Sequence, residues 1–584
     1  MKIAAPIHHQ AILRAIAERT RWRSSFAADI SVFAGILAIL YALFVSGRIW
    51  FAPFTPVAQI SSSPRALPLY AAYSLVRMAI AYFLSLLFAL AYGLAAAKSE
   101  RAARVMLPLL DILQSIPVLS FLPGVMLAMV SLFPRRQLGL ELGSVLLIFT
   151  GQAWNIAFSF YASLKAIPRE LDEAAVLYRF SPWQRFVELE LPYGAIGLVW
   201  NSMMSVAGGW FFLMACEMFV LGDRDFRLPG LGSYLQVAAG SGDMRGIFWG
   251  LAVMIAVIVL LDQLVWRPVI AWADKFKFES VEGAAPRSFA LTLLRRSGFL
   301  AAVHHRAIEP LEEHLTSAFA RRMKVRAASP AADDTTRKWP VRSVGTVALA
   351  ALAWFAIRAV VTLAKLGAAE FVSLARDAAF TFLRVNAALA LGALWTVPVG
   401  VWIGTSPRVA RIAQPLVQVA ASVPATALFP VLLLLLIRSG GGMQSAAMAL
   451  MLLGTQWYIL FNVIAGAMAI PTDLKEAASV FRFSRWERWR RLILPAIFPY
   501  LVTGMLTASG GAWNASIVAE YFHFQGKALF VRGLGASISR ATDSGNLPVL
   551  LAATLVMSVI VVSVNRTLWQ RLYQLAATRY KLDT

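Results

Sequence analysis

Charged residues are scarce in this chain. Only 15% of its 584 residues are Asp, Glu, Lys or Arg, and 59% are hydrophobic, whereas a soluble domain carries about 25% charged residues. The mean hydropathy is +0.66. This composition excludes an ordinary soluble protein and is typical of a chain that crosses a membrane several times.

Cysteine and histidine are scarce as well. Cys216 is the only cysteine, which excludes an intrachain disulfide. The six histidines are scattered, and none has a metal-ligand partner at a usual spacing. A membrane-embedded enzyme would need His, Asp, Glu or Cys gathered at one membrane depth. We therefore predict no metal site and no catalytic residue.

Long apolar runs, by contrast, are frequent. A helix needs about 20 mainly apolar residues to cross a bilayer, and twelve runs have about that length. The sequence therefore predicts an all-α integral membrane protein with twelve transmembrane helices. The expected spans are 30–46, 70–97, 105–133, 145–164, 195–221, 248–265, 344–363, 378–404, 416–437, 446–469, 499–518 and 547–564.

Basic residues predict the orientation of these spans. With both termini in the cytoplasm, the inside segments hold 38 of the 54 Lys and Arg residues, which agrees with the positive-inside rule. The net charge of +23 is therefore a topology signal in part. Because the charge is divided among loops and forms no single face, it does not indicate nucleic-acid binding.

The chain contains two copies of one unit. An offset of 303 superposes Glu173 on Glu476, and eleven of the twenty positions in 173–192 are then identical. Each copy has six expected spans, so both have the same orientation and form two parallel six-helix repeats. The expected domains are a first unit, 1–268, a cytoplasmic linker, 269–341, and a second unit, 342–584. The linker is either a tether or a regulatory, partner-binding segment.

A polar stretch recurs between the fourth and fifth span of each unit, at 168–192 and 471–495; we call these the first and second polar segments. Pro168 and Pro471 favour a helix start, and acidic residues precede basic ones, as the helix dipole prefers. Such a helix, with a face of small residues, suits insertion into a groove on a cytoplasmic partner. The other interpretation is an amphipathic helix at the membrane surface.

Both polar segments have Glu-Ala-Ala, at 173–175 and 476–478, followed by Leu-x-Leu-Pro. This pattern resembles the cytoplasmic EAA loop of inner-membrane permeases of binding-protein-dependent ABC importers. Where that family usually has glycine, six residues after the glutamate, both copies have arginine, Arg179 and Arg482. The usual loop geometry is therefore in question at that point. Further stretches resemble the nitrate/sulfonate/taurine branch; they are 113–126, 208–219, 420–433 and 511–522.

The resemblance implies a type I ABC importer-like fold in a bacterial cytoplasmic (inner) membrane. Its partners would be a cytoplasmic ABC ATPase dimer, a periplasmic or extracellular solute-binding protein, the lipid bilayer and a small-molecule substrate, either an organic or an inorganic anion such as a sulfonate or nitrate. This chain has no G-x-x-x-x-G-K-[ST] loop, so ATP and Mg are expected on the partner, and the chain itself is not an enzyme. A twelve-span ion-coupled secondary transporter is the alternative. The residues expected to couple to the ATPase are Glu173, Ala174, Ala175, Arg179, Glu476, Ala477, Ala478 and Arg482.

Polar residues inside expected spans are candidates for function. Glu217 and Glu520 should lie near the outer ends of their spans, where a structural or gating role is favoured over substrate contact. Arg77 and Arg384 either extend to the membrane interface or pair with these glutamates. The full set of pathway or gating candidates is Ser115, Trp154, Trp210, Glu217, Ser422, Trp457, Trp513, Asn514 and Glu520.

Two glycine pairs, Gly208-Gly209 and Gly510-Gly511, precede these glutamates. A helix break at each pair would place backbone amides near the membrane centre, where discontinuous helices bind anions. Asn514 stands at the position that Phe211 occupies in the first copy. A pathway lined by both copies would therefore be asymmetric.

Overall fold

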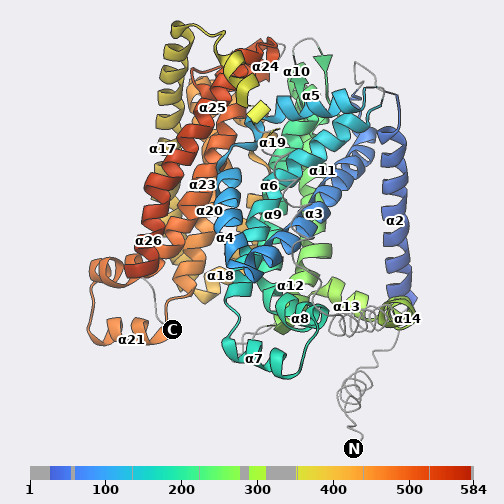
Figure 1. The fold of residues 1–584 in the computed structure, drawn as a ribbon, viewed down its shortest axis with the longest axis vertical. Coiled ribbons are helices and arrows are strands. Elements are labelled where there is room, and N and C mark those ends of the chain that lie inside the picture. Colours follow the sequence, from blue (N-terminus) through green and yellow to red (C-terminus); the bar gives the residue numbers. More distant parts are fainter. Residues whose placement is uncertain are drawn as a thin grey trace, which may run out of the picture. The chain divides into compact units, whose positions relative to one another are not determined.

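The computed structural model describes residues 26–53, 60–134, 136–221, 224–276, 288–310, 350, 353–354, 356–438, 440–524 and 527–579. The fold is almost entirely helical (Figure 1). Nine helices in the described ranges are long and apolar enough to cross a membrane, or ten if one bent pair counts as a span. The expected all-α membrane fold is thus confirmed. The nine are Phe26–Trp50, Pro64–Lys98, Leu138–Lys165, Pro182–Glu217, Met244–Ala273, Ala368–Thr405, Met443–Met468, Arg485–Ala519 and Leu547–Ala576.

Two of the expected spans are not continuous helices. The run 105–133 is divided into α4 (Glu100–Ser115), the short 3₁₀ helix η2 (Val118–Ser120) and α5 (Leu122–Leu132). The run 416–437 is divided between α18 (Pro407–Ser422) and α19 (Ala425–Arg438), which bend by 78°. The prediction of single spans was wrong here. Of the expected span 344–363, nine of the twenty residues lie outside the described residues.

Proline explains both divisions. A residue that precedes proline is disfavoured in the α conformation because the proline ring clashes with its backbone. Ile116, before Pro117, has φ −75° and ψ 125°, and Val423, before Pro424, has φ −73° and ψ 117°. The chain is therefore extended at the same point of both copies, although hydropathy alone predicts one continuous span there.

The secondary structure repeats with the same offset as the sequence. From Arg169 to Trp266 each helix has a counterpart that starts 303 residues later, including short π-helical turns at two equivalent places. The pairs are α7 (Arg169–Leu177) and α21 (Thr472–Val480), α8 (Pro182–Arg185) and α22 (Arg485–Arg488), η3 (Phe186–Glu190) and η7 (Trp489–Ile493), α9 (Leu191–Glu217) and α23 (Leu494–Ala519), α10 (Leu231–Ser241) and α24 (Leu534–Asp543), α11 (Met244–Leu261) and α25 (Leu547–Val564), and η4 (Asp262–Trp266) and η8 (Asn565–Trp569).

The contacts within the chain define two compact units. The smaller unit comprises Met1–Val45, Ala166–Trp200 and Leu260–Asp333. Its described elements include part of α2 (Phe26–Trp50), α7, α8, η3, α12 (Arg267–Ala273), α13 (Phe289–Arg295) and α14 (Gly298–Val303). There Asp29 accepts hydrogen bonds from the Ser297 hydroxyl (2.6 Å) and the Phe299 amide (3.0 Å). These bonds fix α14 to the start of α2.

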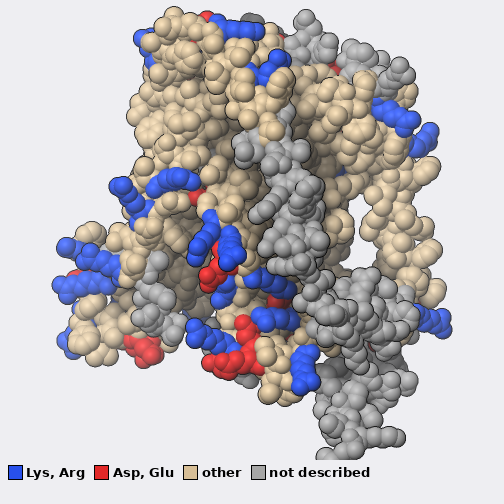
Figure 2. Space-filling view, in the orientation of Figure 1, with Lys and Arg blue, Asp and Glu red and all other residues tan. Residues whose placement is uncertain are grey.

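The larger unit comprises Ser46–Lys165, Asn201–Val259 and Asp334–Thr584. In it α3 (Leu67–Lys98) packs on α6 (Leu138–Lys165), and α20 (Met443–Met468) packs on both α17 (Ala368–Thr405) and α23. The two copies meet inside this unit, because α4 contacts α25 and η2 contacts α23. Figure 2 shows a mainly uncharged surface over α17 and α25, as expected for helices that face lipid.

Each copy also has one short antiparallel hairpin. The first pairs β1 (Val220–Leu221) with β2 (Arg224–Asp225), and Val220 is opposite Asp225. The second pairs β3 (Tyr521–Phe524) with β4 (Lys527–Phe530), and Tyr521 is opposite Phe530. Each hairpin lies between the long fifth helix of its copy and the Gly-Leu-Gly turn that begins the next helix. The hairpins therefore follow directly after the candidate glutamates.

Candidate functional site

A buried ion cluster holds the first copy together at the end of α9. The Arg77 guanidinium donates two hydrogen bonds to Glu141, of 2.6 and 2.8 Å, and one of 2.8 Å to Glu217. It also donates to the Pro229 carbonyl. At most 1% of the Arg77, Glu141 and Glu217 side chains is exposed. Arg77 therefore pairs with Glu217 and does not extend to the interface; we call Arg77, Glu141 and Glu217 the first buried cluster.

Glu217 also fixes the start of α10. Its carboxylate accepts hydrogen bonds from the Gly232 amide and the Ser74 hydroxyl, both at 2.7 Å, and the Ser74 hydroxyl accepts one from the Leu231 amide at 3.0 Å. A Cβ atom at Gly230 would overlap this carboxylate. The glycine turn is therefore required by the close approach of the glutamate, and a negative charge is favourable at a helix N-terminus.

The second copy repeats this arrangement with Glu520, Arg384 and Thr381, which we call the second buried cluster. Glu520 pairs with Arg384 and accepts hydrogen bonds from Thr381 and from the Gly535 amide, both at 2.8 Å. A Cβ atom at Gly533 would overlap its carboxylate. Each cluster joins long helices to a following short helix: three in the first copy, α3, α6 and α9, and two in the second, α17 and α23.

The two clusters differ in their charge balance. Arg77 is bound by two carboxylates, whereas in the described residues the buried Nε of Arg384 has no hydrogen-bond partner. The second copy has another acid nearby, Asp377, which accepts from the Ser537 hydroxyl at 2.7 Å and lies 3.4 Å from Arg532. The first cluster is therefore the more completely paired of the two.

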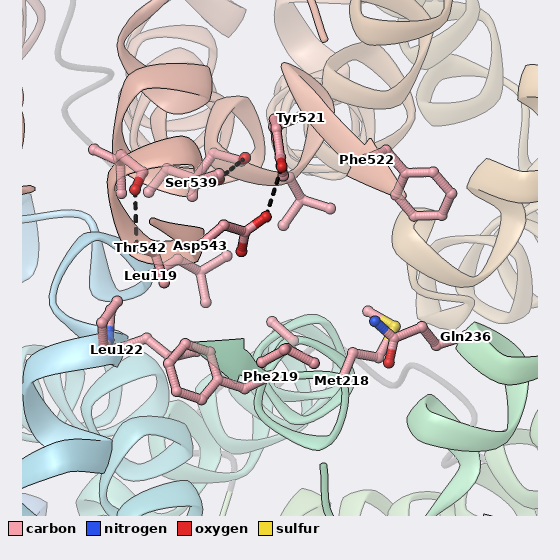
Figure 3. A pocket seen from close by; sticks show the side chains of 16 residues that line it. Leu119, Leu122, Met218, Phe219, Gln236, Tyr521, Phe522, Ser539, Thr542 and Asp543 are labelled. Carbon is pink, nitrogen blue, oxygen red and sulfur yellow. Dashed lines mark hydrogen bonds between the residues drawn. The ribbon is translucent and has the colours of Figure 1, made fainter. Parts of the chain in front are cut away.

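A cavity of about 310 Å³ lies between the two copies within the larger unit (Figure 3). We call it the hairpin cavity, because Val220 of β1 and Tyr521 and Phe522 of β3 line it. The Tyr521 hydroxyl donates to Asp543 at 2.6 Å, and burial together with this carboxylate raises the pKa of Tyr521 above its usual range. Among the described lining residues Asp543 is the only charged one.

A second cavity of about 110 Å³ lies where α18 and α19 divide, and we call it the helix-break cavity. Ser422 to Ala425 line it, so the N-terminus of α19 faces it. Phe211 of the first copy and Asn514 of the second, which are equivalent in sequence, both line it as well. No charged residue occurs among its described lining residues. Its polar side chains are Gln418, Ser422, Tyr458 and Asn514.

Eight of the nine predicted pathway residues fall into three groups. Ser422, Trp457 and Asn514 line the helix-break cavity, and Glu217 and Glu520 belong to the buried clusters. The remaining tryptophans, Trp154, Trp210 and Trp513, line neither cavity. Trp154 packs edge-on against Phe88 and Phe149, while Trp210 and Trp513 are 2% and 1% exposed. Ser115 ends α4, but its side chain lies outside the described part.

Sequence reasoning missed Gln418, Tyr458 and Phe211 as cavity residues. Polar side chains inside expected spans were the available signal for the first two. No helix break occurs at the glycine pairs, since α9 and α23 run through them without interruption. Gly209 instead allows close packing on Gln152.

In the polar segments, α7 and α21 begin directly after Pro168 and Pro471, as expected. Glu173 and Glu476 are exposed, and Ala174 and Ala477 are partly buried. The second alanine of each pair, Ala175 or Ala478, is covered by the chain's own residues. The small face is therefore used in part for internal packing. The most exposed apolar side chains of α7 and α21 lie at the C-terminal ends of these helices; they are Val176, Leu177 and Tyr178 in the first segment and Val480 and Phe481 in the second.

Arg179 and Arg482 have φ values of +53° and +51°, and they are the only non-glycine residues of the described chain with positive φ. The Phe180 amide donates to the Ala175 carbonyl at 2.9 Å and the Arg179 amide to the Val176 carbonyl at 3.0 Å. The second segment repeats both bonds. This is the Schellman motif, which usually ends in glycine. The arginines therefore keep the conformation that glycine would adopt.

Comparison with known families gives two matches. A family model described as "Binding-protein-dependent transport system inner membrane component" matches residues 86–265 and again residues 396–573. The matches cover more than half of the chain, one in each copy. They confirm that the chain is a tandem of two related membrane units.

Curated relatives resemble part of the chain. A nitrate import permease protein of Leptolyngbya laminosa and a bicarbonate transport system permease protein of a Synechocystis species are each 31% identical over 137 residues, which is 24% of this chain and 48% of the relative. A taurine transport system permease protein of Escherichia coli is 28% identical over 177 residues, 30% of this chain and 61% of the relative. The chain thus spans about half the length of the curated relatives it matches.

Proposed function

Because this chain belongs to the family of binding-protein-dependent transport system inner membrane components, we propose that it forms the membrane pathway of an ATP-driven importer of a small anion. The names of its relatives support an anion. Nitrate and bicarbonate are anions, and taurine carries a sulfonate group. Both copies of the family unit contribute to one pathway in this proposal.

The helix-break cavity is the observation that carries the proposal. It lies between the two copies, and the N-terminus of α19 supplies a partial positive charge there. The side-chain amides of Gln418 and Asn514 each have a second N–H that can donate a hydrogen bond, and no carboxylate opposes an anion among the described lining residues. The rest of the wall is apolar and includes Met, Phe and Trp side chains, which favours an anion with an apolar part, such as an organic sulfonate.

The remaining parts of the importer follow from the family. We propose that the exposed ends of α7 and α21 bind a cytoplasmic ATPase dimer, which holds ATP and Mg, and that a solute-binding protein delivers the anion on the other side of a bacterial inner membrane. Both termini would be cytoplasmic. The proposed domains are 1–268, the linker 269–341 and 342–584, and one chain would provide the complete pore.

Reconstitution in vesicles tests this function. The full chain, its ATPase and its solute-binding protein should give anion uptake that requires ATP on the ATPase side. Uptake should stop when Glu173 and Glu476 are both changed to Lys, because the coupling surface is lost. Uptake driven by an ion gradient without any ATPase would contradict the proposal and favour a secondary transporter.

A further inference from the structure

The left-handed arginines stand at the exposed ends of the two candidate coupling helices. Left-handed backbone is unfavourable for any residue with a Cβ atom, and such strain is concentrated at functional sites. Arg179 and Arg482 adopt it at equivalent points of both copies. Glycine would relieve the strain at either position. The arginine side chain must therefore supply something that glycine does not.

Internal contacts do not account for either side chain. Both arginines are exposed, and within the described part of the chain neither guanidinium forms a hydrogen bond, an ion pair or a cation–π contact. Arg185, in the same segment as Arg179, behaves differently: it binds Asp172 at 2.9 Å and Glu190 at 3.0 Å. Among the described residues, no polar contact therefore explains why arginine stands at either position.

The charge around the two arginines is not shared between the copies. The first polar segment has three basic and five acidic residues, whereas the second has six basic and three acidic ones. The positive charge six residues after the glutamate is nevertheless present in both. The positive charge is thus the feature that both segments share at this point. This fits two identical or closely related partner subunits, each of which binds one segment with the same surface.

We propose that the partner ATPase presents a carboxylate to each of these arginines, beside an apolar groove. This inference rests on the proposed function, because it assigns the partner's chemistry at the same surface. The groove would receive Leu177 and Tyr178 in the first segment, which are 79% and 74% exposed, and Val480 and Phe481 in the second, which are 77% and 74% exposed. A guanidinium binds a carboxylate through two parallel hydrogen bonds, which fixes both position and orientation. The left-handed turn places that charge directly after the apolar contact.

Substitutions at both positions separate charge from backbone strain. The double changes to Gly and to Asn keep the left-handed turn without the charge, and the double change to Lys keeps the charge. Arg245→Asn is the matched control, because Arg245 is also exposed but lies at the start of α11, outside both polar segments. The probe is the ATPase subunit that copurifies with the full chain, identified by its P-loop sequence and produced separately.

The Gly variant should unfold at an unchanged or higher temperature, yet bind the ATPase about tenfold more weakly, as expected for loss of a charge-assisted contact. Its binding should also depend less on salt. The Asn variant should behave similarly, the Lys variant should retain most of the affinity, and the control should bind normally.

Unchanged ATPase affinity in the Gly and Asn variants would overturn the proposal. The proposal would also be overturned if the two arginines proved to be needed for binding to anionic lipid and not to the ATPase, because lipid phosphate would then be the counter-charge. If the unaltered chain binds no ATPase and vesicle uptake needs none, the proposed function itself fails, and the two failures are thereby distinguished.

Discussion

Arginine is used in two opposite ways in this chain. Arg77 and Arg384 are buried and paired with glutamates that bind the next helix start. Arg179 and Arg482 are exposed, left-handed and without an internal partner in the described residues. The first pair serves the folded state of each copy, and the second pair is available to another molecule.

The unequal charge balance of the buried clusters predicts unequal sensitivity. Arg77→Met leaves two carboxylates, Glu141 and Glu217, buried without their cation, and we expect a loss of about 3–5 kcal/mol. Arg384→Met should cost less, because it leaves only one carboxylate, Glu520, buried without its cation. Thermal unfolding in detergent measures both.

The control for this comparison is Arg376→Met, which removes an exposed arginine from the same helix as Arg384. It should change the free energy of unfolding by no more than about 0.5 kcal/mol. If Arg77→Met and Arg384→Met lower the unfolding temperature equally, the additional pairing of Arg77 with Glu141 contributes nothing to stability.

Among the helices, the divided ones are the elements that face the cavities. η2 and α5 contribute Leu119 and Leu122 to the hairpin cavity, and the α18–α19 junction contributes Ser422 to Ala425 to the helix-break cavity. A β-branched residue followed by proline causes each division: Ile-Pro in the first copy and Val-Pro in the second. The position of one proline in each copy thus determines where the helices that line the two cavities are divided.

Pro424→Ala should slow transport while the chain still folds. Without proline, Val423 can adopt the helical conformation, so α18 and α19 can become continuous and the N-terminus at the helix-break cavity is lost. We expect uptake in vesicles to fall at least about tenfold if the end of α19 contributes one charge-assisted contact to the anion.

Pro407→Ala is the matched control for this prediction. Pro407 is the first residue of α18, where proline only replaces an amide that has no helical partner. Its replacement should leave uptake nearly unchanged. Equal uptake by the Pro424 and Pro407 variants would show that the division of the helix is not needed for transport.

Elements with strong periodic signals were predictable from sequence, and contacts were not. The offset of 303 and the apolar runs located most helices, and Pro168 and Pro471 located the starts of α7 and α21. The divided spans were missed because an averaged hydropathy conceals the effect of one proline. The pairing of Arg77 with Glu141 was also missed, since it joins residues 64 positions apart on different helices.

At the scale of the whole molecule, side-chain contacts join the two copies directly. In the larger unit Asp111 of α4 accepts hydrogen bonds from Asn565 at 3.2 Å and Gln570 at 2.8 Å. The Thr554 hydroxyl donates to the Ser120 carbonyl at 3.1 Å, and Asn514 accepts from the Leu119 amide at 3.4 Å. The two copies are therefore held together by these hydrogen bonds as well as by the expected linker.

A protease site inserted in the expected linker should leave the two copies associated after cleavage. The contacts of Asp111, Thr554 and Asn514 remain in the cut chain, so both fragments should elute together from a sizing column in mild detergent. Asp111→Ala should increase the fraction of the fragments that elute separately, because it removes two hydrogen bonds at once. Fragments that separate completely without this substitution would show that the linker itself holds the copies together.

Tandem fusion also changes how the cavity wall can evolve. In a pore made from two identical subunits, one mutation alters both sides at once, and a change that benefits one side is rejected if it harms the other. Here Phe211 and Asn514 occupy equivalent positions of the helix-break cavity but are encoded separately. Selection can therefore act on each side independently, so one copy can provide an apolar wall while the other provides an amide for a polar group of the same solute.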